Sequence, residues 1–150
     1  MTFRSSRLGF GIAGIVLVSA TAACAAAPQT SAHGGSATAG IWGTAWRLED
    51  LGGAGVLDRV EATLEFPEVG KAVGSGSCNQ FFATVEISGE SMTFGPLAAT
   101  RMVCAGAVGT QERKYLGALR GAKRFALEGS VLLIYANGKE RPLRFRRARP

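Results

Sequence analysis

The chain has 150 residues, of which 47% are hydrophobic, and its formal net charge is +6. This length suits one ordinary domain that buries a real core. Its three cysteines and one histidine argue against a serine-histidine-aspartate hydrolase and most zinc enzymes, which need a positioned base or three to four protein ligands.

Residues 1–23 have the pattern of a secretory signal peptide. Arg4 and Arg7 supply a positive start, residues 8–18 form an apolar run, and residues 19–23 are small. The apolar run is shorter than the roughly 20 residues that a membrane-spanning helix needs. We therefore predict that the protein is exported, and we leave this segment out of the fold.

The end of the signal also predicts a lipid anchor at Cys24. Ala22-Ala23-Cys24 resembles a bacterial lipobox, although Thr21 stands where a large aliphatic residue is usual. Three cysteines leave one unpaired in an exported chain, and acylation of Cys24 accounts for it. The protein would then be a membrane-anchored lipoprotein of the cell envelope. The alternative is ordinary cleavage near Ala25, which leaves a secreted or periplasmic soluble protein.

Residues 24–39 are predicted to be a flexible tether. They are mostly alanine, serine, threonine and glycine, with Pro28 and His33, and so have little to bury. Because His33 has no partner held near it, neither a metal ligand nor a catalytic base is expected there. Residues 40–150 then form the single domain.

Alternation of apolar and polar residues predicts strands in the first part of the domain. Residues 60–66 alternate in this way and end at Pro67, and residues 81–87 follow the same pattern. Residues 88–91 form a turn into residues 92–94, which predicts a hairpin.

Three further strands are predicted at residues 124–127, 130–136 and 142–146. Gly129 separates the first two, and Asn137-Gly138, a strong hairpin signal, separates the last two. Residues 132–134 are apolar on both faces, so the middle strand is expected to be central in the sheet. Pro142 has no amide donor and suits the start of the last strand or an edge.

One amphipathic helix is predicted for residues 110–120. Thr110 is a capping residue, Glu112 is acidic in the first turn, and Gly121 follows the end. We expect Tyr115, Leu116 and Leu119 to face the sheet, with Glu112, Arg113 and Lys114 nearer solvent. The fold class is therefore α+β, with one helix packed on a strongly antiparallel sheet.

Cys78 and Cys104 are predicted to form a disulfide, because export leaves them as an even pair. A catalytic Cys78 is the alternative, but a thiolate nucleophile needs a base and the one histidine lies in the tether. Asn79 is expected to be structural, through bonds to neighbouring backbone or a left-handed conformation.

Other sequence features are better explained by structure than by chemistry. Gly74-Ser75-Gly76 lacks the lysine and helix of a phosphate loop, so we expect glycines that permit a bulge or tight bend. Glu61 and Glu65 share one strand face, which we expect to be solvated.

The arginines at residues 141–149 lack interleaved aromatic residues, which disfavours nucleic-acid binding. Their charge suits a solvated edge strand. Weak attraction to anionic lipid headgroups is a further possibility.

With these elements placed, the chain resembles the META domain family, which includes the heat-shock protein HslJ. The matching residues are Trp46, Leu48, Gly74, Cys78, Asn79, Thr100, Arg101, Met102, Cys104, Glu112, Tyr115, Leu116 and Leu119. Ser77, Ala83 and Val85 depart from the family, Ser77 standing where glycine is usual. The resemblance implies a strongly curved antiparallel sheet, or partial barrel, holding one helix. It also implies an envelope or secreted protein linked to stress, antibiotic tolerance or secretion, with no known reaction.

The sequence as a whole predicts a non-enzymatic META-domain lipoprotein that acts as a binding module and supports envelope stress or antibiotic tolerance. Its partners would be the membrane, through the lipid anchor, and a further protein or lipid. No cofactor, metal or nucleic acid is expected. The alternatives are a lipid-binding or secretion-assisting protein and a hydrolase.

Overall fold

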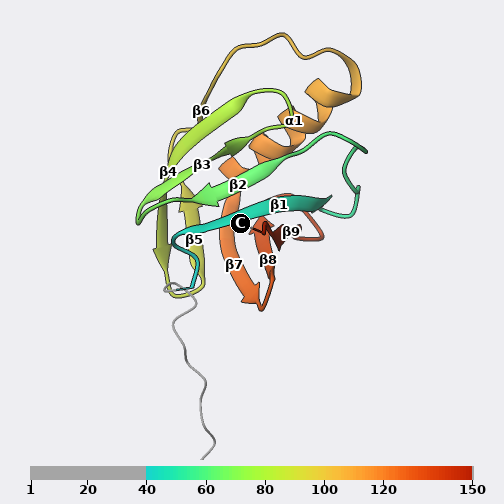
Figure 1. The fold of residues 1–150 in the computed structure, drawn as a ribbon. Coiled ribbons are helices and arrows are strands. Elements are labelled where there is room, and N and C mark those ends of the chain that lie inside the picture. Colours follow the sequence, from blue (N-terminus) through green and yellow to red (C-terminus); the bar gives the residue numbers. More distant parts are fainter. Residues whose placement is uncertain (1–39, 150) are drawn as a thin grey trace, which may run out of the picture. The chain divides into compact units, whose positions relative to one another are not determined.

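The computed structural model describes residues 40–149 (Figure 1). The predicted signal peptide, the anchor at Cys24 and the tether with His33 lie outside the described residues and stay predictions. Within residues 40–149, the one helix is too short and too polar to cross a membrane.

The described residues form nine strands and one helix. These elements are β1 (Thr44–Leu51), β2 (Thr63–Phe66), β3 (Lys71–Ser75), β4 (Gln80–Ser88), β5 (Ser91–Phe94), β6 (Ala98–Ala99), α1 (Gly106–Arg120), β7 (Ala122–Glu128), β8 (Val131–Ala136) and β9 (Leu143–Arg147). The strands predicted by alternation are confirmed, with ends shifted by a few residues. The three predicted turns each contain a glycine with positive φ, Gly89 and Gly129 at 59° and Gly138 at 70°.

The sheet closes on itself, which corrects the expected partial barrel. Its strand order is β3-β2-β1-β9-β8-β7-β5-β4-β6, and β3 also pairs with β4, so that eight strands form a closed ring. The short β6 pairs with β4 alone and is not part of this ring. The strands form two antiparallel runs, one from β1 to β5 and the other from β7 to β9. The two runs are joined where β1 pairs with β9 and where β5 pairs with β7. The β5–β7 junction is thin: Ser91 is opposite Arg124, and the Phe125 amide donates to the Glu90 carbonyl. Closure pairs strand edges that would otherwise be open to other chains.

The last strand is internal, so the edge-strand explanation for the arginines is wrong. β9 pairs with β1 on one side and β8 on the other. Leu143 and Phe145 are buried, whereas Arg146 is exposed and Arg144 is partly exposed. Charge at this position therefore does not protect an edge. The prediction that β8 is central is confirmed, because β8 lies between β7 and β9.

The helix begins at Gly106, earlier than the predicted Thr110. Thr110 lies inside it, where its hydroxyl donates to the Gly106 carbonyl over 3.1 Å, and no side chain caps the start. As expected, Tyr115, Leu116 and Leu119 are buried while Arg113 and Lys114 are exposed. Glu112 is the exception, because it is only 9% exposed and is not in the first turn.

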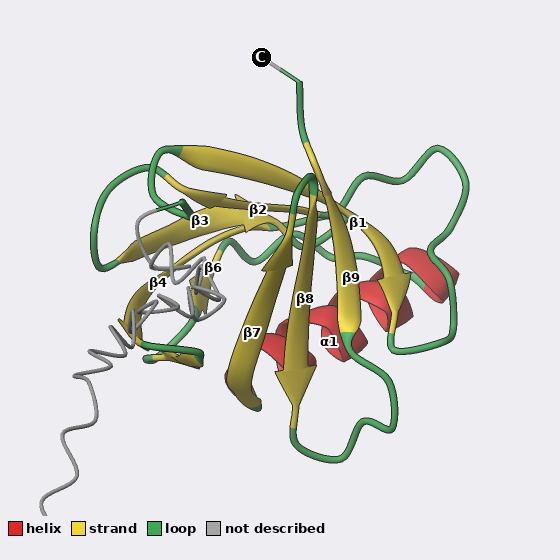
Figure 2. Cartoon of the chain, turned by 90° about the horizontal axis from the view of Figure 1, so that it is seen from below, coloured by secondary structure: helices red, strands yellow, loops and turns green. Residues whose placement is uncertain are grey.

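The helix packs against the barrel core (Figure 2). The ring of Tyr115 lies 6.0 Å from that of Phe81 on β4 and 6.1 Å from that of Phe145 on β9, centroid to centroid. The largest fully buried side chains are Trp46, Tyr115, Phe66, Phe125, Phe145, Ile41, Leu64, Met92, Leu119, Leu132, Ile134 and Leu143. Core, closed sheet, helix and disulfide all lie within residues 40–149, so this part has what it needs to fold by itself.

Candidate functional site

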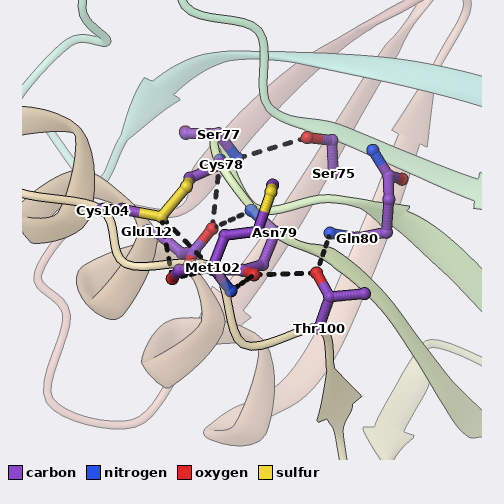
Figure 3. The surroundings of a disulfide bond; sticks show 9 residues. All are labelled: Ser75, Ser77, Cys78, Asn79, Gln80, Thr100, Met102, Cys104 and Glu112. Carbon is purple, nitrogen blue, oxygen red and sulfur yellow. Dashed lines mark hydrogen bonds between the residues drawn. A yellow bond between two sulfur atoms is a disulfide. The ribbon is translucent and has the colours of Figure 1, made fainter.

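The sequence motifs meet around Asn79, a residue that is 4% exposed and precedes β4 (Figure 3). Its side-chain oxygen accepts from the Thr100 hydroxyl at 2.7 Å and from the Met102 amide at 2.8 Å. Its side-chain nitrogen donates to Glu112 Oε1 at 2.8 Å, and lies 3.3 Å from both the Met102 carbonyl and Cys104 Sγ. Asn79 therefore ties β4 to the segment before the helix. Asn79 binds backbone groups, as a structural residue would, but their residue, Met102, is distant in sequence, and Asn79 does not have the left-handed conformation that was the other expectation.

Glu112 approaches Asn79 from α1. Its Oε2 accepts from the amides of Cys78, at 3.1 Å, and Asn79, at 2.6 Å. A carboxylate that accepts two backbone amides makes strong charge-assisted bonds and fixes the turn between β3 and β4 on the helix. Glu112 is thus a core polar residue, whereas Glu61 and Glu65 are exposed as expected.

The predicted disulfide between Cys78 and Cys104 is present, with the two Cα atoms 6.3 Å apart. It closes a loop whose ends are 26 residues apart, which stabilises a fold by about 3 kcal/mol through the unfolded chain. Both sulfurs and a carboxylate oxygen of Glu112 lie within 4.8 Å of one another, a spacing that suits a metal ion. Because the two sulfurs are bonded to each other, they do not act as thiolate ligands here.

Close packing, rather than a bulge or tight bend, explains the glycines at 74 and 76. A Cβ on Gly74 would lie 2.2 Å from the Thr63 carbonyl oxygen, and one on Gly76 would lie 2.8 Å from Glu112 Cγ. Neither glycine has positive φ. Glycine is needed here so that β3 can approach β2 and so that Glu112 can reach its amides.

Gln111, which the sequence analysis missed, connects two loops to the helix. It is 6% exposed, its Oε1 accepts from the Leu57 amide at 2.7 Å, and its Nε2 donates to the Ser77 hydroxyl at 2.9 Å. Extending the helical spacing back from Tyr115 and Leu116 by one turn would have placed Gln111 and Glu112 on the buried face.

The remaining buried motif residues complete the core. The Tyr115 hydroxyl donates to the Thr63 carbonyl at 2.9 Å, and burial raises the pKa of this phenol well above its usual value. Trp46 donates from Nε1 to the Thr44 hydroxyl at 2.6 Å, and Leu48 is 3% exposed.

A family model, the META domain, matches residues 39–149. The chain belongs to the META domain family. An NMR structure of a protein from Burkholderia xenovorans matches with a TM-score of 0.63 and 23% identity, over 76% of this chain and 88% of the other. A second NMR structure matches with a TM-score of 0.59 and 24% identity, over 72% and 92%. These identities show the fold alone. A search of curated proteins finds no match.

Ser77, where the family resemblance leads us to expect glycine, has a φ of 109°, a region that side chains rarely adopt. We expect Ser77→Gly to be more stable than Ser77→Ala by about 1–2 kcal/mol, because both lose the hydroxyl that binds Gln111 and only glycine relieves the strain. Urea unfolding of the two variants checks this. Equal midpoints would contradict it.

Two residues of the META motif have exposed side chains, and one of them, Met102, contributes through its backbone. Arg101 is exposed, and the Met102 side chain is 59% exposed although its backbone binds Asn79. The next residue, Val103, is 98% exposed. We call residues 100–105 the 100–105 loop.

The polar groups of this cluster are occupied by the fold. In the described part of the chain, every buried side-chain nitrogen and oxygen has a hydrogen-bond partner. Asn79, Glu112 and Gln111 all hold backbone amides or carbonyls of loops. The arrangement is therefore suited to fixing the loops around the start of α1.

Proposed function

We propose that this META protein is an exported, non-enzymatic lipoprotein, anchored at Cys24, that binds a protein partner in the cell envelope. The 100–105 loop is the binding surface. Through this contact the protein supports tolerance of envelope stress or antibiotics.

The observation that supports this proposal is a rigidly held loop with apolar side chains in solvent. Val103 is 98% exposed and Met102 59%, and both are large hydrophobic residues. A single exposed hydrophobic residue needs no explanation, but two in succession beside a disulfide suit a contact surface.

The loop is fixed on both sides of these residues. On one side the Met102 amide donates to Asn79, and on the other Cys104 is bonded to Cys78. A surface already fixed in its bound shape loses less entropy on association, which raises affinity without new contacts. The charge-assisted bonds of Glu112 hold the same turn on the helix.

The test is site-specific photo-crosslinking in the native envelope. A photoreactive residue at position 103 is expected to form a cross-linked protein adduct of defined mass. An excess of the unmodified chain is expected to reduce the yield of this adduct by competing for the partner. Val69 provides a matched control, because it is also an apolar residue, 75% exposed, in the turn between β2 and β3. Equal adduct yields at positions 69 and 103, or none at 103, would contradict the proposal.

The non-enzymatic part of the proposal has its own support and its own test. His33, the one histidine, is outside the described residues, and the cysteines of the domain are joined. Nucleophilic catalysis by a thiol needs a free thiolate and a base. Turnover of any ester, peptide or glycoside by the purified protein, lost in a single-residue variant that still folds, would overturn this part.

The lipid-binding alternative is less well supported. It would need an apolar space within the sheet, and large side chains such as Tyr115, Phe125 and Phe145 are fully buried there. We therefore place the proposed contact on the outside of the barrel.

A further inference from the structure

A group of arginines lies at one end of the barrel, where β1 begins and β9 ends. We call Arg47, Arg146, Arg147 and Arg149 the arginine surface. All four are exposed. In Figure 2 the chain end that follows β9 projects from this end of the sheet.

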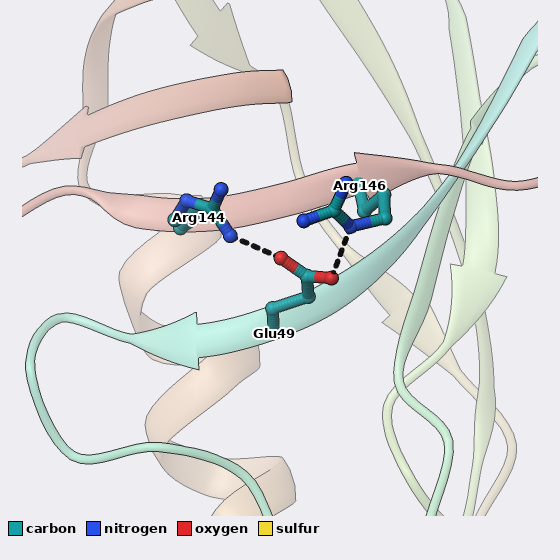
Figure 4. Close-up of polar contacts among 3 residues, drawn as sticks. All are labelled: Glu49, Arg144 and Arg146. Carbon is teal, nitrogen blue, oxygen red and sulfur yellow. Dashed lines mark hydrogen bonds and ion pairs between the residues drawn. The ribbon is translucent and has the colours of Figure 1, made fainter. Parts of the chain in front are cut away.

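On the arginine surface, like charges face each other where β1 pairs with β9. Arg47 on β1 is directly opposite Arg146 on β9, an arrangement that costs stability. Glu49 compensates part of this charge, because its carboxylate binds both Arg144 and Arg146 (Figure 4). The Arg146 guanidinium, which donates a hydrogen bond to this carboxylate, lowers the pKa of Glu49, so the pair is ionised at neutral pH. The ion pairs found within residues 40–149 do not include Arg47 or Arg149.

Arg147 is held in place at the point where the described chain begins. Its Nη2 donates to the Gly40 carbonyl at 3.2 Å, and its guanidinium lies 5.0 Å from the centre of the Trp46 ring. The Ala148 amide also donates to the Ala45 carbonyl at 2.8 Å. Arg147, one member of the arginine surface, therefore contacts the residue at which the predicted tether joins the domain.

The surface is hollowed in two places that open beside these arginines. One hollow of about 370 Å³ is lined by Arg47, Arg146, Arg147, Ala148 and Arg149. A second, of about 300 Å³, is lined by Arg147 and Arg149 together with Gly43, Thr44, Ala45 and Ala148. A guanidinium group can bind two oxygens of one phosphate through two N–H groups. These hollows therefore suit a phosphate group that enters from outside the barrel.

We propose that the arginine surface faces the membrane and binds the phosphates of anionic lipid headgroups. This inference rests on the proposed anchor at Cys24 only because that anchor would hold the domain close to the bilayer. A chain from Cys24 to Gly40 spans at most about 55 Å when fully extended, which keeps the arginine surface within reach of the headgroups. Juxtamembrane arginines gain free energy from the negative surface potential of such lipids.

This orientation presents the 100–105 loop away from the bilayer. The end of β1 at Leu51 shares a hollow with Ala107 and Thr110 at the start of α1, whereas the beginning of β1 lies at the arginine surface. Figure 1 likewise shows the segment between β6 and α1 far from the point where β1 begins. One end of the domain would thus meet lipid and the other a protein.

The test is co-sedimentation of residues 40–150 with vesicles of phosphatidylcholine alone or with 30% phosphatidylglycerol. We expect binding to the mixed vesicles that weakens at high salt. The variant with Arg47→Gln and Arg149→Gln is expected to bind roughly 10- to 30-fold more weakly, since each surface arginine contributes separately. The control carries Arg113→Gln and Arg120→Gln, which remove the same charge from exposed positions on α1.

Three results would overturn the inference. These are equal binding to both vesicle types, equal losses in the two variant pairs, and binding of inorganic pyrophosphate without binding of vesicles, which would indicate a site for a soluble anion. Residues 40–150 lack Cys24 and keep the 100–105 loop. A negative result would therefore leave the proposed protein partner to be tested by the cross-linking experiment, and it would not bear on the proposed anchor.

Discussion

Replacing Asn79 with alanine is expected to lower the free energy of unfolding by about 3–5 kcal/mol, because several bonded groups lose their partner in a buried site. The Thr100 hydroxyl and the Met102 amide lose their acceptor, and Glu112 loses one donor. Urea unfolding of the oxidised protein measures the effect.

Gln80 gives the matched control for this prediction. It follows Asn79 directly, but its side chain is exposed, so Gln80→Ala is expected to change stability by no more than about 0.5 kcal/mol. Similar losses for the two variants would show that the bonds of Asn79 do not stabilise the fold in the way described.

Gly74→Ala is expected to destabilise the domain by about 3 kcal/mol or more, at the upper end for an overpacked core. The added methyl would lie 2.2 Å from the Thr63 carbonyl oxygen, a backbone atom. That oxygen also accepts from the Tyr115 hydroxyl, so its displacement strains the contact between α1 and β2. The midpoint and slope of urea unfolding report this loss.

The control for Gly74 is a glycine with free space around it. Gly117 lies within α1 and is exposed, and beyond its chain neighbours and the nearby helix backbone no atom lies within 4 Å of the position of an added Cβ. Gly117→Ala is therefore expected to stabilise the protein by about 0.5–1 kcal/mol through helix propensity. A stable Gly74→Ala protein would remove close packing as the reason for glycine at this position.

The strands and the apolar helix face followed from local patterns. Phe81, Ala83 and Val85 alternate toward the core of β4, and the turn at Gly89 leads into β5, as the sequence predicted. Local alternation and turn chemistry decide these features, because each involves residues a few positions apart.

Closure of the barrel did not follow from such patterns. It depends on Leu48 of β1 lying opposite Phe145 of β9, and on the single register pair of Ser91 with Arg124. The local sequence of β1 or β5 does not specify a partner strand so far along the chain. For the same reason the charged β9 was taken for an edge strand, although it has a partner on each side and its Leu143 and Phe145 lie in the core.

The polar part of the site was predicted only in part. The cysteines pair as expected, an inference that rested on predicted export and on the even pair that is left if Cys24 is the lipid anchor. Glu112 was placed nearer solvent together with Arg113 and Lys114, whereas its helical position, one turn before the buried Leu116, puts it on the buried face. Its partners are amides of Cys78 and Asn79, and a sequence does not show which amides a loop leaves unpaired.

The central claim is that the family residues hold the 100–105 loop rigidly while its apolar side chains face solvent. Amide hydrogen exchange at Met102 tests it most directly, because this amide donates to Asn79 over 2.8 Å beneath a side chain that is 59% exposed. We expect protection of the Met102 amide close to that of the β4 amides, because core strands are expected to open only on global unfolding. Exchange at the rate of an unstructured loop would contradict it.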